Sequence, residues 1–309
     1  MPRASRPGKP ARWIAHTVSP DEAGRTVEQI LVDSMRISRR MIQRLTRGKG
    51  IQLNRRPAYL ARTVREGDVI TARVEWAEES GLRPVPMELA IAHEDADLLV
   101  LDKPPFLLVH PTAPHHDSTL AHGVAHYLLE RGIQAKVRPI HRIDRDTSGL
   151  VLFAKTAVAH HRLDLQLREH TLRREYLAFV EGLVEGEEGV IDAPIGRHAR
   201  NQELRAVRPD GEPALTRYRV VERLAGATLL ALELETGRTH QIRVHLAHLH
   251  HPLIGDRAYG ARESALLRRQ ALHSSRLSFL HPTTEAPVTV EAPLPPDLQA
   301  LHERLGNSK

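Results

Sequence analysis

The uneven distribution of charge is the feature that most restricts how this chain can fold. Residues 1–76 contain 16 basic and 7 acidic residues, whereas residues 77–309 contain 28 basic and 31 acidic residues. A single domain usually mixes both signs over its surface, so this division favours a small basic domain followed by a larger, nearly neutral one. We predict a disordered basic arm, a basic domain, a linker and a larger domain, over residues 1–12, 13–76, 77–86 and 87–309.

The composition excludes several classes of protein. The chain has no cysteine, which excludes disulfides, thiolate catalysis and cysteine-ligated metals. The basic N-terminus is not followed by an apolar stretch, which argues against a signal peptide, and no run approaches the roughly 18 apolar residues of a membrane span. We therefore expect a cytoplasmic protein without a membrane partner.

The basic domain carries a run of like charge. Between Ser34 and Arg65 lie ten basic residues and no acid, and Ser38 is a suitable N-cap for a helix over residues 39–47. A solvated helix face is the simpler explanation, but such a face would repel itself without interspersed acids. Phosphate groups would relieve that repulsion, so the run favours nucleic-acid binding. The expected contacts are Arg36, Arg39, Arg40, Arg44, Arg47, Lys49, Arg55 and Arg56, of which Arg36, Arg40, Arg44 and Arg47 are predicted to share one helical face.

The larger domain mixes helices and strands without a regular alternation, which favours an α+β fold over a doubly wound one. Apolar runs predict strands near residues 98–101, 150–154, 176–180, 215–221, 228–235 and 277–279. Amphipathic patterns predict helices near residues 118–131, 157–169 and 239–249, and from residue 297 onward.

Three polar stretches beside apolar runs are candidates for chemistry. Asp144 lies between Arg142 and Arg145, before a Thr-Ser-Gly turn, and adjacent arginines favour its carboxylate as nucleophile, base or electrostatic partner. Turn formation and surface ion pairs explain it equally well. Arg238 lies near a helix N-terminus, where a cation needs an anionic neighbour. Tyr176 leads into an apolar strand, and its pattern alone favours a core aromatic over a base-stacking one.

The 20 histidines do not predict a metal site. The largest cluster, His240 to His251, contains no HExxH motif, and there is no cysteine to complete a zinc set. The chain also lacks a phosphate-binding Walker A motif and a GxGxxG motif. We expect no metal and no cofactor.

Together these stretches resemble a known family. HRIDRDTSGLVLFAK resembles the signature of the RluA-type pseudouridine synthases, and RREYLAFVEG and TGRTHQIRVHLAHLHHPLIGDRAYG resemble two further family motifs in the family's order. The likeness covers residues 86–282. RISRRMIQRLTRGKGIQLNRRP and VREGDVI resemble the S-four-like RNA-binding domain. Two departures are Ile143 in place of Leu and His251 in place of Gly.

The resemblance implies a mixed-sheet catalytic domain that converts uridine to pseudouridine in RNA without a cofactor. Asp144 would be the essential carboxylate, attacking C1′, adding to C6 or removing a C2′ proton. Arg142 would fill the stack left by the flipped base, Tyr176 would stack on that base, and Arg238 would pair with Asp144. The expected partner is structured RNA, most often ribosomal large-subunit RNA with transfer RNA as the alternative, and the family default is a monomer.

Two other classes of protein would account for part of the sequence. A non-catalytic RNA-binding protein would use the larger domain only as support. A glycoside hydrolase would need Asp144 and Asp146 about 5–9 Å apart across one sugar, and it would leave the basic run unexplained.

Overall fold

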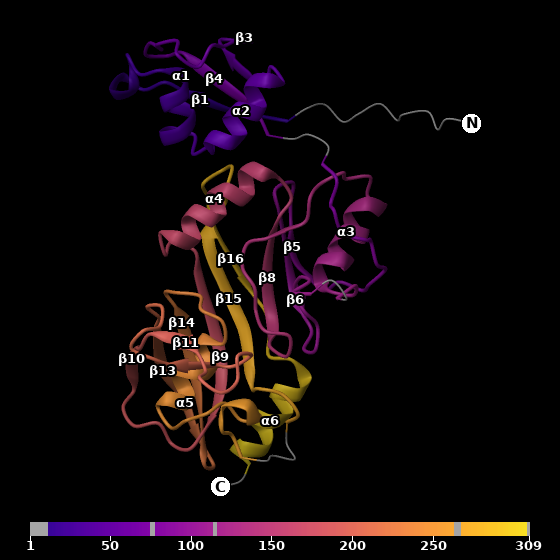
Figure 1. Ribbon diagram of the computed structural model, residues 1–309, viewed down its shortest axis with the longest axis vertical. Helices are drawn as coiled ribbons and strands as arrows, with labels where there is room; N and C mark the ends of the chain where they lie inside the picture. Colours follow the sequence, from indigo (N-terminus) through magenta and orange to yellow (C-terminus); the bar gives the residue numbers. More distant parts are fainter. Residues whose placement is uncertain (1–11, 75–77, 114–115, 263–266, 308–309) are drawn as a thin grey trace, which may run out of the picture.

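The chain forms two units, one above the other along the long axis of the molecule (Figure 1). The computed structural model describes residues 12–74, 78–113, 116–262 and 267–307. Of the predicted basic arm, only Arg12 lies within these ranges. Among the described helices, none combines the length and the apolar character that crossing a membrane requires.

The N-terminal unit is a four-stranded antiparallel sheet covered by short helices. The strand order is β1-β4-β2-β3. Its elements are β1 (Trp13–Thr17), α1 (Val27–Gln29) continued by a π-turn, α2 (Arg39–Arg47), β2 (Ile51–Leu53), β3 (Arg56–Pro57) and β4 (Val69–Arg73). As predicted, the Ser38 hydroxyl caps α2 by accepting a hydrogen bond from the Met41 amide at 3.3 Å. Strand β1 was not predicted, because five residues give too short an alternation of apolar and polar side chains to identify a strand. Its pairing with β4 is visible only in the structure.

The predicted helical face of four arginines is wrong at its first member. Helix α2 begins at Arg39, and Arg36 lies before it in a left-handed conformation with φ 48°. Its guanidinium forms an ion pair with Glu169 at 3.0 Å. The charges of Arg40, Arg44 and Arg47 remain on α2.

The larger unit is built on one mixed sheet in the order β10-β13-β14-β9-β15-β8-β6-β5, to which β16 and β7 are added. Strands β8 and β15 are parallel and the other pairs are antiparallel, which confirms the α+β class. The strands are β5 (Ile91–Glu94), β6 (Leu98–Lys103), β7 (Arg138–Pro139), β8 (Ser148–Ala154), β9 (Arg173–Glu181), β10 (Glu188–Asp192), β11 (Ile195–Arg197), β12 (Arg205–Val207), β13 (Leu215–Leu224), β14 (Ala227–Leu234), β15 (Leu272–Leu280) and β16 (Pro287–Glu291). The helices are α3 (Leu120–Glu130), α4 (Ala157–Arg168), α5 (Gln241–His248) and α6 (Pro296–Gly306), and Arg257–Tyr259 forms a 3-10 turn.

The centre of this sheet is buried on both faces. In β6, Leu99 and Leu101 belong to the core that includes α3, whereas Leu98 and Val100 belong to the core that includes α4. A strand covered on both faces reads as a continuous apolar run, which is why the pattern of β6 was visible in the sequence.

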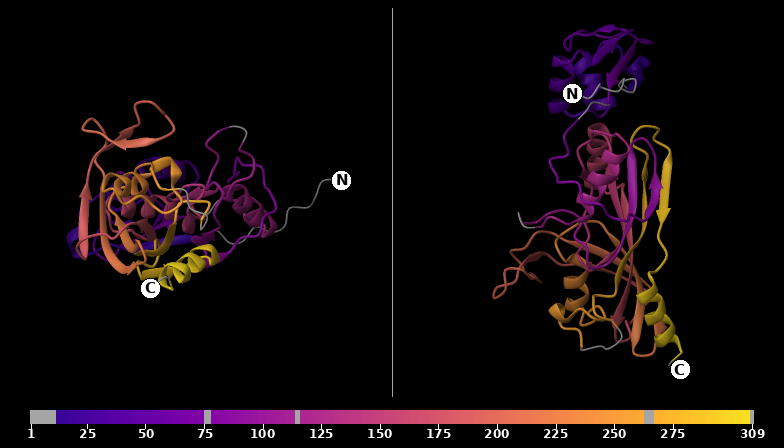
Figure 2. Two further views of the ribbon diagram at one scale, coloured as in Figure 1. Left: turned by 90° about the horizontal axis from the view of Figure 1, so that it is seen from below. Right: turned by 90° about the vertical axis from the view of Figure 1, so that its right-hand side faces the viewer.

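Helix α4 joins the two units. Val158 on α4 is buried in the core of the N-terminal unit, among residues such as Ile37 and Met41. One turn further on, the Arg162 guanidinium donates to the carbonyl oxygen of Met35 at 3.0 Å. The N-terminal unit therefore rests on a helix of the larger unit (Figures 1 and 2).

Candidate active site

The loop that carries Asp144 is held by backbone contacts on both sides. The Thr147 amide donates to the Asp144 carbonyl at 3.2 Å, which closes a turn just before β8. The buried Lys103 ammonium, at the end of β6, donates to the Arg145 carbonyl at 3.0 Å and to the Pro104 carbonyl at 2.8 Å. The loop between β7 and β8 is thus fixed to the neighbouring strand.

The Asp144 carboxylate is paired with Arg243 of α5. The distance from Asp144 Oδ2 to Arg243 Nη1 is 3.2 Å. Arg243 also binds the buried Asp256 carboxylate through Nε and Nη2, at 2.7 and 2.8 Å. Burial alone would lower the pKa of Arg243, but its hydrogen bonds to Asp256 and the charge of Asp144 raise that pKa above its usual value. One arginine therefore stays charged between two carboxylates.

This arrangement corrects the predicted partner of Asp144. Arg238 lies before α5, where its Nε donates to the Pro213 carbonyl at 3.0 Å and its guanidinium pairs with Glu212. Because α5 begins at Gln241, the cation in the first helical turn is Arg243. A cation in the first turn of this helix does have anionic neighbours, but it is Arg243 and not the predicted Arg238. Arg238 still lines the same cavity as Asp144.

His240 is the second group facing Asp144. Its Nε2 lies 3.9 Å from Asp144 Oδ2, and its Nδ1 lies 2.7 Å from the Tyr259 hydroxyl. That hydroxyl also accepts a hydrogen bond from the Arg205 amide at 3.0 Å, which fixes the position of the Tyr259 ring beside His240. Burial lowers the pKa of His240, and the nearby charge of Asp144 opposes that shift.

The four residues predicted for the catalytic centre line one cavity. Asp144, Arg142, Tyr176 and Arg238 share an opening of about 460 Å³ with His240. Tyr176 is 3% exposed and belongs to the core of the sheet while it also forms the cavity wall. Burial raises the pKa of the Tyr176 phenol, which keeps it protonated at neutral pH. Asp146, the second acid of the hydrolase alternative, pairs with Arg145 and does not line this cavity.

Sequence reasoning missed Arg243, Asp256, His240 and Lys103. Arg243 carried a usable signal, since it is a cation near the start of the predicted helix over residues 239–249, where a cation needs an anionic neighbour. Lys103 carried another, because a lysine that ends an apolar strand is either solvated or buried against carbonyl groups. Asp256 gave no signal of its own.

The eight predicted nucleic-acid contacts of the N-terminal unit are all exposed. Two of them have acidic partners from beyond the basic run: Arg36 pairs with Glu169, and Arg44 pairs with Glu78 at 2.6 Å. The acid-free run is therefore partly neutralised in three dimensions. Within the described part of the chain, six make no ion pair: Arg39, Arg40, Arg47, Lys49, Arg55 and Arg56.

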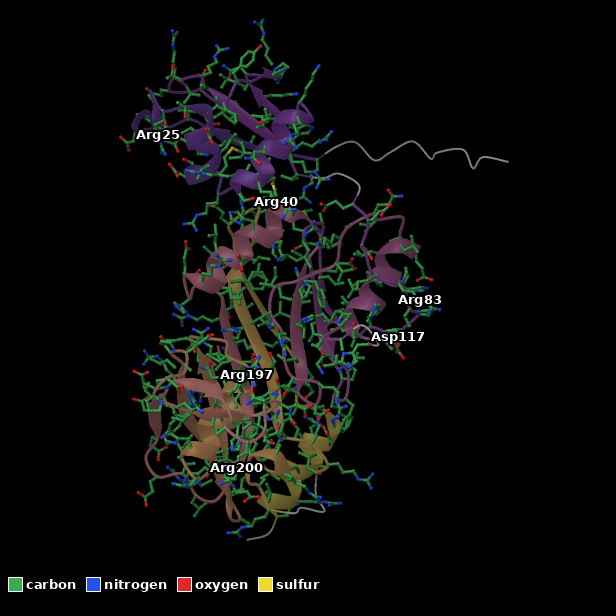
Figure 3. The ribbon with its side chains drawn as sticks, viewed as in Figure 1. Arg25, Arg40, Arg83, Asp117, Arg197 and Arg200 are labelled. Carbon is green, nitrogen blue, oxygen red and sulfur yellow. The ribbon has the colours of Figure 1, made fainter. Side chains whose placement is uncertain are left out.

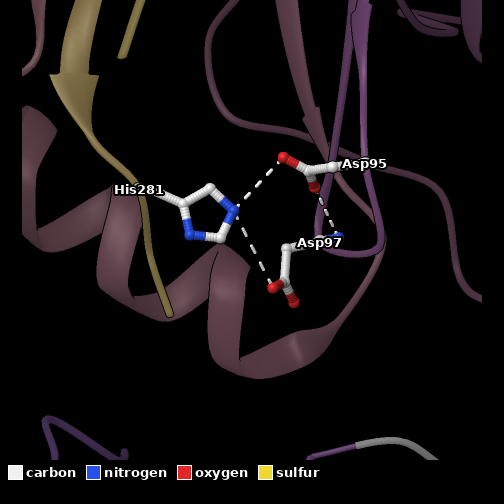
Figure 4. Close-up of side chains that lie close together, drawn as sticks. All are labelled: Asp95, Asp97 and His281. Atoms are coloured by element: carbon white, nitrogen blue, oxygen red, sulfur yellow. Dashed lines mark hydrogen bonds and ion pairs between the residues drawn. The ribbon is translucent and has the colours of Figure 1, made fainter. Parts of the chain in front are cut away.

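One group of side chains has the composition of a metal site. Asp95, Asp97 and His281 lie close together beside the turn between β5 and β6 (Figure 4). His281 Nδ1 accepts from the Thr283 and Thr284 amides at 3.2 and 3.0 Å, so Nε2 carries the hydrogen and faces Asp95 Oδ2 at 3.2 Å. Arg12 also pairs with Asp97. Hydrogen bonds and an ion pair account for this group without a metal.

His251, which departs from the family pattern, has a definite role in the structure. Its Nδ1 donates to the Glu181 carbonyl at 2.8 Å, and its ring lies against Gly182. The imidazole thus supports the turn after β9, away from Asp144.

Two family models match the chain. Residues 97–248 match the RNA pseudouridylate synthase model, and residues 15–70 match the N-terminal domain model of the RluD ribosomal pseudouridine synthase. Among solved structures, Human RNA Pseudouridylate Synthase Domain Containing 1 is similar, with a TM-score of 0.57 and 28% identity over 68% of this chain and 86% of that one.

Several relatives are similar over nearly their whole length. The uncharacterized RNA pseudouridine synthase YlyB of Bacillus subtilis is 39% identical, over 94% of this chain and 97% of its own. Ribosomal large subunit pseudouridine synthase D of Vibrio parahaemolyticus is 37% identical, over 94% of each chain. At this degree of identity, and with the Asp144 motif lining a cavity, the chain belongs to the RluA-type RNA pseudouridine synthases, enzymes that isomerise uridine in RNA.

Proposed function

We propose that this chain isomerises uridines of ribosomal large-subunit RNA, with Asp144 as the essential carboxylate. One observation carries the assignment of the residue: a carboxylate held by a buried arginine faces a cavity of about 460 Å³. That volume is within the range of small-molecule sites and accommodates a nucleoside. The choice of RNA is supported by the relatives named ribosomal large subunit pseudouridine synthase D.

The chemistry requires a charged carboxylate beside the ribose. The N1–C1′ bond breaks, the uracil ring turns, and C5 bonds to C1′ while the C5 hydrogen is lost and N1 gains one. Asp144 acts by attacking C1′, by adding to C6 or by removing the C2′ proton, and in each case it starts as an anion. The Arg243 guanidinium, 3.2 Å from Asp144 Oδ2, supplies the opposite charge beside that anion.

The walls of the cavity suit an extruded base. A uridine in folded RNA must leave its stack before the ribose can reach Asp144. We assign Tyr176 to the wall against which the uracil ring lies and the exposed Arg142, at the mouth, to the space that the base vacates. Arg238, which also lines the cavity, is assigned to a neighbouring phosphate.

The N-terminal unit, residues 13–76, supplies added affinity in this proposal. It carries six exposed basic side chains that make no ion pair within the described residues, and it also carries Tyr59, which is 83% exposed. Cations that neutralise phosphates and an exposed aromatic ring that stacks on a base are the usual means of binding RNA.

The proposal is tested by Asp144→Asn. The variant keeps the shape of the side chain, so we expect normal folding and RNA binding but no release of tritium from large-subunit ribosomal RNA transcribed with [5-³H]uridine. Turnover near that of the unchanged protein would contradict the role of Asp144.

The RNA target is tested in cells. Pseudouridines are mapped in ribosomal and transfer RNA from cells with and without the gene, and we expect one or more to vanish from the large-subunit RNA. Loss from transfer RNA alone would replace the proposed substrate with the alternative one.

A further inference from the structure

A second cavity lies beside the catalytic one. It has a volume of about 310 Å³ and opens between the β11–β12 hairpin and helix α5. Leu204 and Val207 line it from the hairpin, and Val244 and Ala247 line it from α5. The mechanism above assigns no role to this space.

The two cavities are separated by a pair of rings in edge-to-face contact. Tyr259 lines the second cavity and His240 lines the catalytic one. Their ring centroids are 5.7 Å apart at 80°, and the Tyr259 hydroxyl is bonded to His240 Nδ1 at 2.7 Å. A ligand in the second cavity would therefore lie one aromatic ring away from the group that faces Asp144.

The second cavity also contains a hydrogen-bond donor of known orientation. His198 Nδ1 accepts from the Arg200 and Asn201 amides, each at 3.2 Å. The neutral imidazole consequently carries its hydrogen on Nε2. Apolar walls with an N–H donor and a phenol ring suit a flat heterocycle that has an acceptor on its edge.

The hairpin around the cavity is positively charged. Residues 195–208 include four arginines and one acid, and Arg197 and Arg200 are exposed on the same half of the larger unit as α5 (Figure 3). In both views of Figure 2 the hairpin stands out from the sheet. A charged arm over an apolar cavity fits a base attached to phosphates better than it fits an apolar peptide.

We propose that this cavity receives a second unpaired nucleobase of the RNA, a near neighbour in sequence of the uridine held beside Asp144. The base packs between the hairpin and α5, its edge accepts from His198 Nε2, and its phosphates lie along the hairpin arginines. This proposal rests on the proposed function. It predicts that the enzyme selects its uridine partly by a flanking base that it does not modify.

The test combines a cavity-filling substitution with abasic RNA. Once the modified uridine is mapped, a stem-loop that contains it is synthesised with one abasic nucleotide at each of the flanking positions in turn. Tritium release is measured for the unchanged protein, for Ala247→Trp, which fills the cavity, and for Ala225→Trp, which adds the same bulk at an exposed turn. His198→Ala adds no bulk and removes the donor together with the two hydrogen bonds that Nδ1 accepts. It is tested in case the larger substitution disturbs folding, and thermal unfolding reports the stability of both variants.

We expect one abasic position to raise KM about 10-fold in the unchanged protein, as the loss of one stacked base does. Ala247→Trp should raise KM similarly on the intact stem-loop and show no further loss at that position. His198→Ala should show a smaller loss with the same position dependence, and Ala225→Trp should behave as the unchanged protein. If every abasic position raises KM by the same factor in the unchanged protein, in Ala247→Trp and in His198→Ala, and the unchanged protein is active, the second-base site is wrong. An inactive unchanged protein would instead contradict the proposed function.

Discussion

Arg243 compensates for the partial loss of hydration of the Asp144 carboxylate. A carboxylate that is 18% exposed loses part of its hydration, and a partner must replace it. Arg243 does so, and its own desolvation is offset by the bidentate bond to Asp256 and by its position 4.7 Å from the centre of the Tyr259 ring. Removing Arg243 would therefore leave two carboxylates without their partner, whereas removing Asp144 would leave Arg243 bonded to Asp256.

Substitutions of Arg243 and Arg238 should affect different kinetic parameters. Arg243→Lys keeps the charge but loses the fork that bonds two carboxylates, so we expect kcat to fall about 100-fold with little change in KM. Arg238→Ala leaves that network intact and should raise KM while kcat is retained. Equal effects of the two substitutions on kcat would show that Arg238 acts on Asp144 after all.

Lys103 should make stability depend on pH. Burial lowers its pKa in the folded chain from 10.5 to about 7. Between these values the unfolded chain binds more protons at this side chain, so the free energy of unfolding should rise as the pH increases from about 7 to about 10. Lys103→Met should flatten this rise in urea unfolding curves. It should also lower kcat, because the Arg145 carbonyl loses its donor and the Asp144 loop loosens. A stability curve that keeps its slope in Lys103→Met would locate the titrating group elsewhere.

At the scale of elements, the position of Asp144 depends on how the backbone turns from the Asp144 loop into β8. Strand β8 pairs with β15 in parallel only at Ser148 and Gly149, whereas with β6 it pairs along its length. Gly149 has φ 107°, and a Cβ there would lie 2.2 Å from the Ser274 carbonyl oxygen. The chain can turn from the Asp144 loop into the sheet because this position carries no side chain.

Gly149→Ala should therefore destabilise the protein strongly. The clash is with backbone rather than with a flexible side chain, so we expect the free energy of unfolding to fall by more than about 3 kcal/mol, with poor folding as the extreme case. Gly226→Ala is a suitable control, because its φ is also positive but no atom lies within 4 Å of the added Cβ. Similar losses from both substitutions, measured by chemical unfolding, would assign the effect to backbone conformation alone.

At the scale of the whole molecule, α4 fixes the basic unit above the catalytic sheet. Val158 completes the core of the N-terminal unit, and Arg162 holds the end of its π-turn. Deleting residues 1–76 would therefore expose an apolar patch on α4. Charge substitutions in the complete chain test the role of the N-terminal unit more cleanly.

RNA affinity should become less salt-dependent when the unpaired charges are removed. For Arg47→Ser, Lys49→Ser and Arg55→Ser combined, we expect the slope of log Kd against log salt to fall by about 0.7–0.9 for each phosphate that the protein no longer neutralises. Arg276→Ser, on β15, serves as the control because that arginine already pairs with Glu291 and should leave the slope unchanged. Filter binding of large-subunit ribosomal RNA at several salt concentrations makes the comparison. An unchanged slope in the triple variant would show that these three side chains do not neutralise RNA phosphates.

Local information in the sequence determined much of the fold. The predicted helix over residues 39–47 matches α2, because a cap residue and short-range apolar spacing specify such an element. The motif around Asp144 likewise identified the family, since a rigid turn before a buried strand has a recognisable composition. Strands β11 and β12 were missed because each has only three residues, which is too short for an alternating pattern to be recognised in the sequence.

Tertiary structure decided which charges meet. Arg243 and Asp144 are far apart in sequence, as are Asp97 and Arg12, and a like-charge run such as that in the N-terminal unit acquires Glu169 and Glu78 only on folding. Pairing of this kind depends on where helices and loops end in space. Ion pairs between residues that are distant in sequence leave no repeating pattern that could be recognised in that sequence. The sequence by itself therefore determined the family and singled out Asp144 as the candidate carboxylate. Only the fold could show that Arg243, not Arg238, holds that carboxylate and that a second cavity lies beside it.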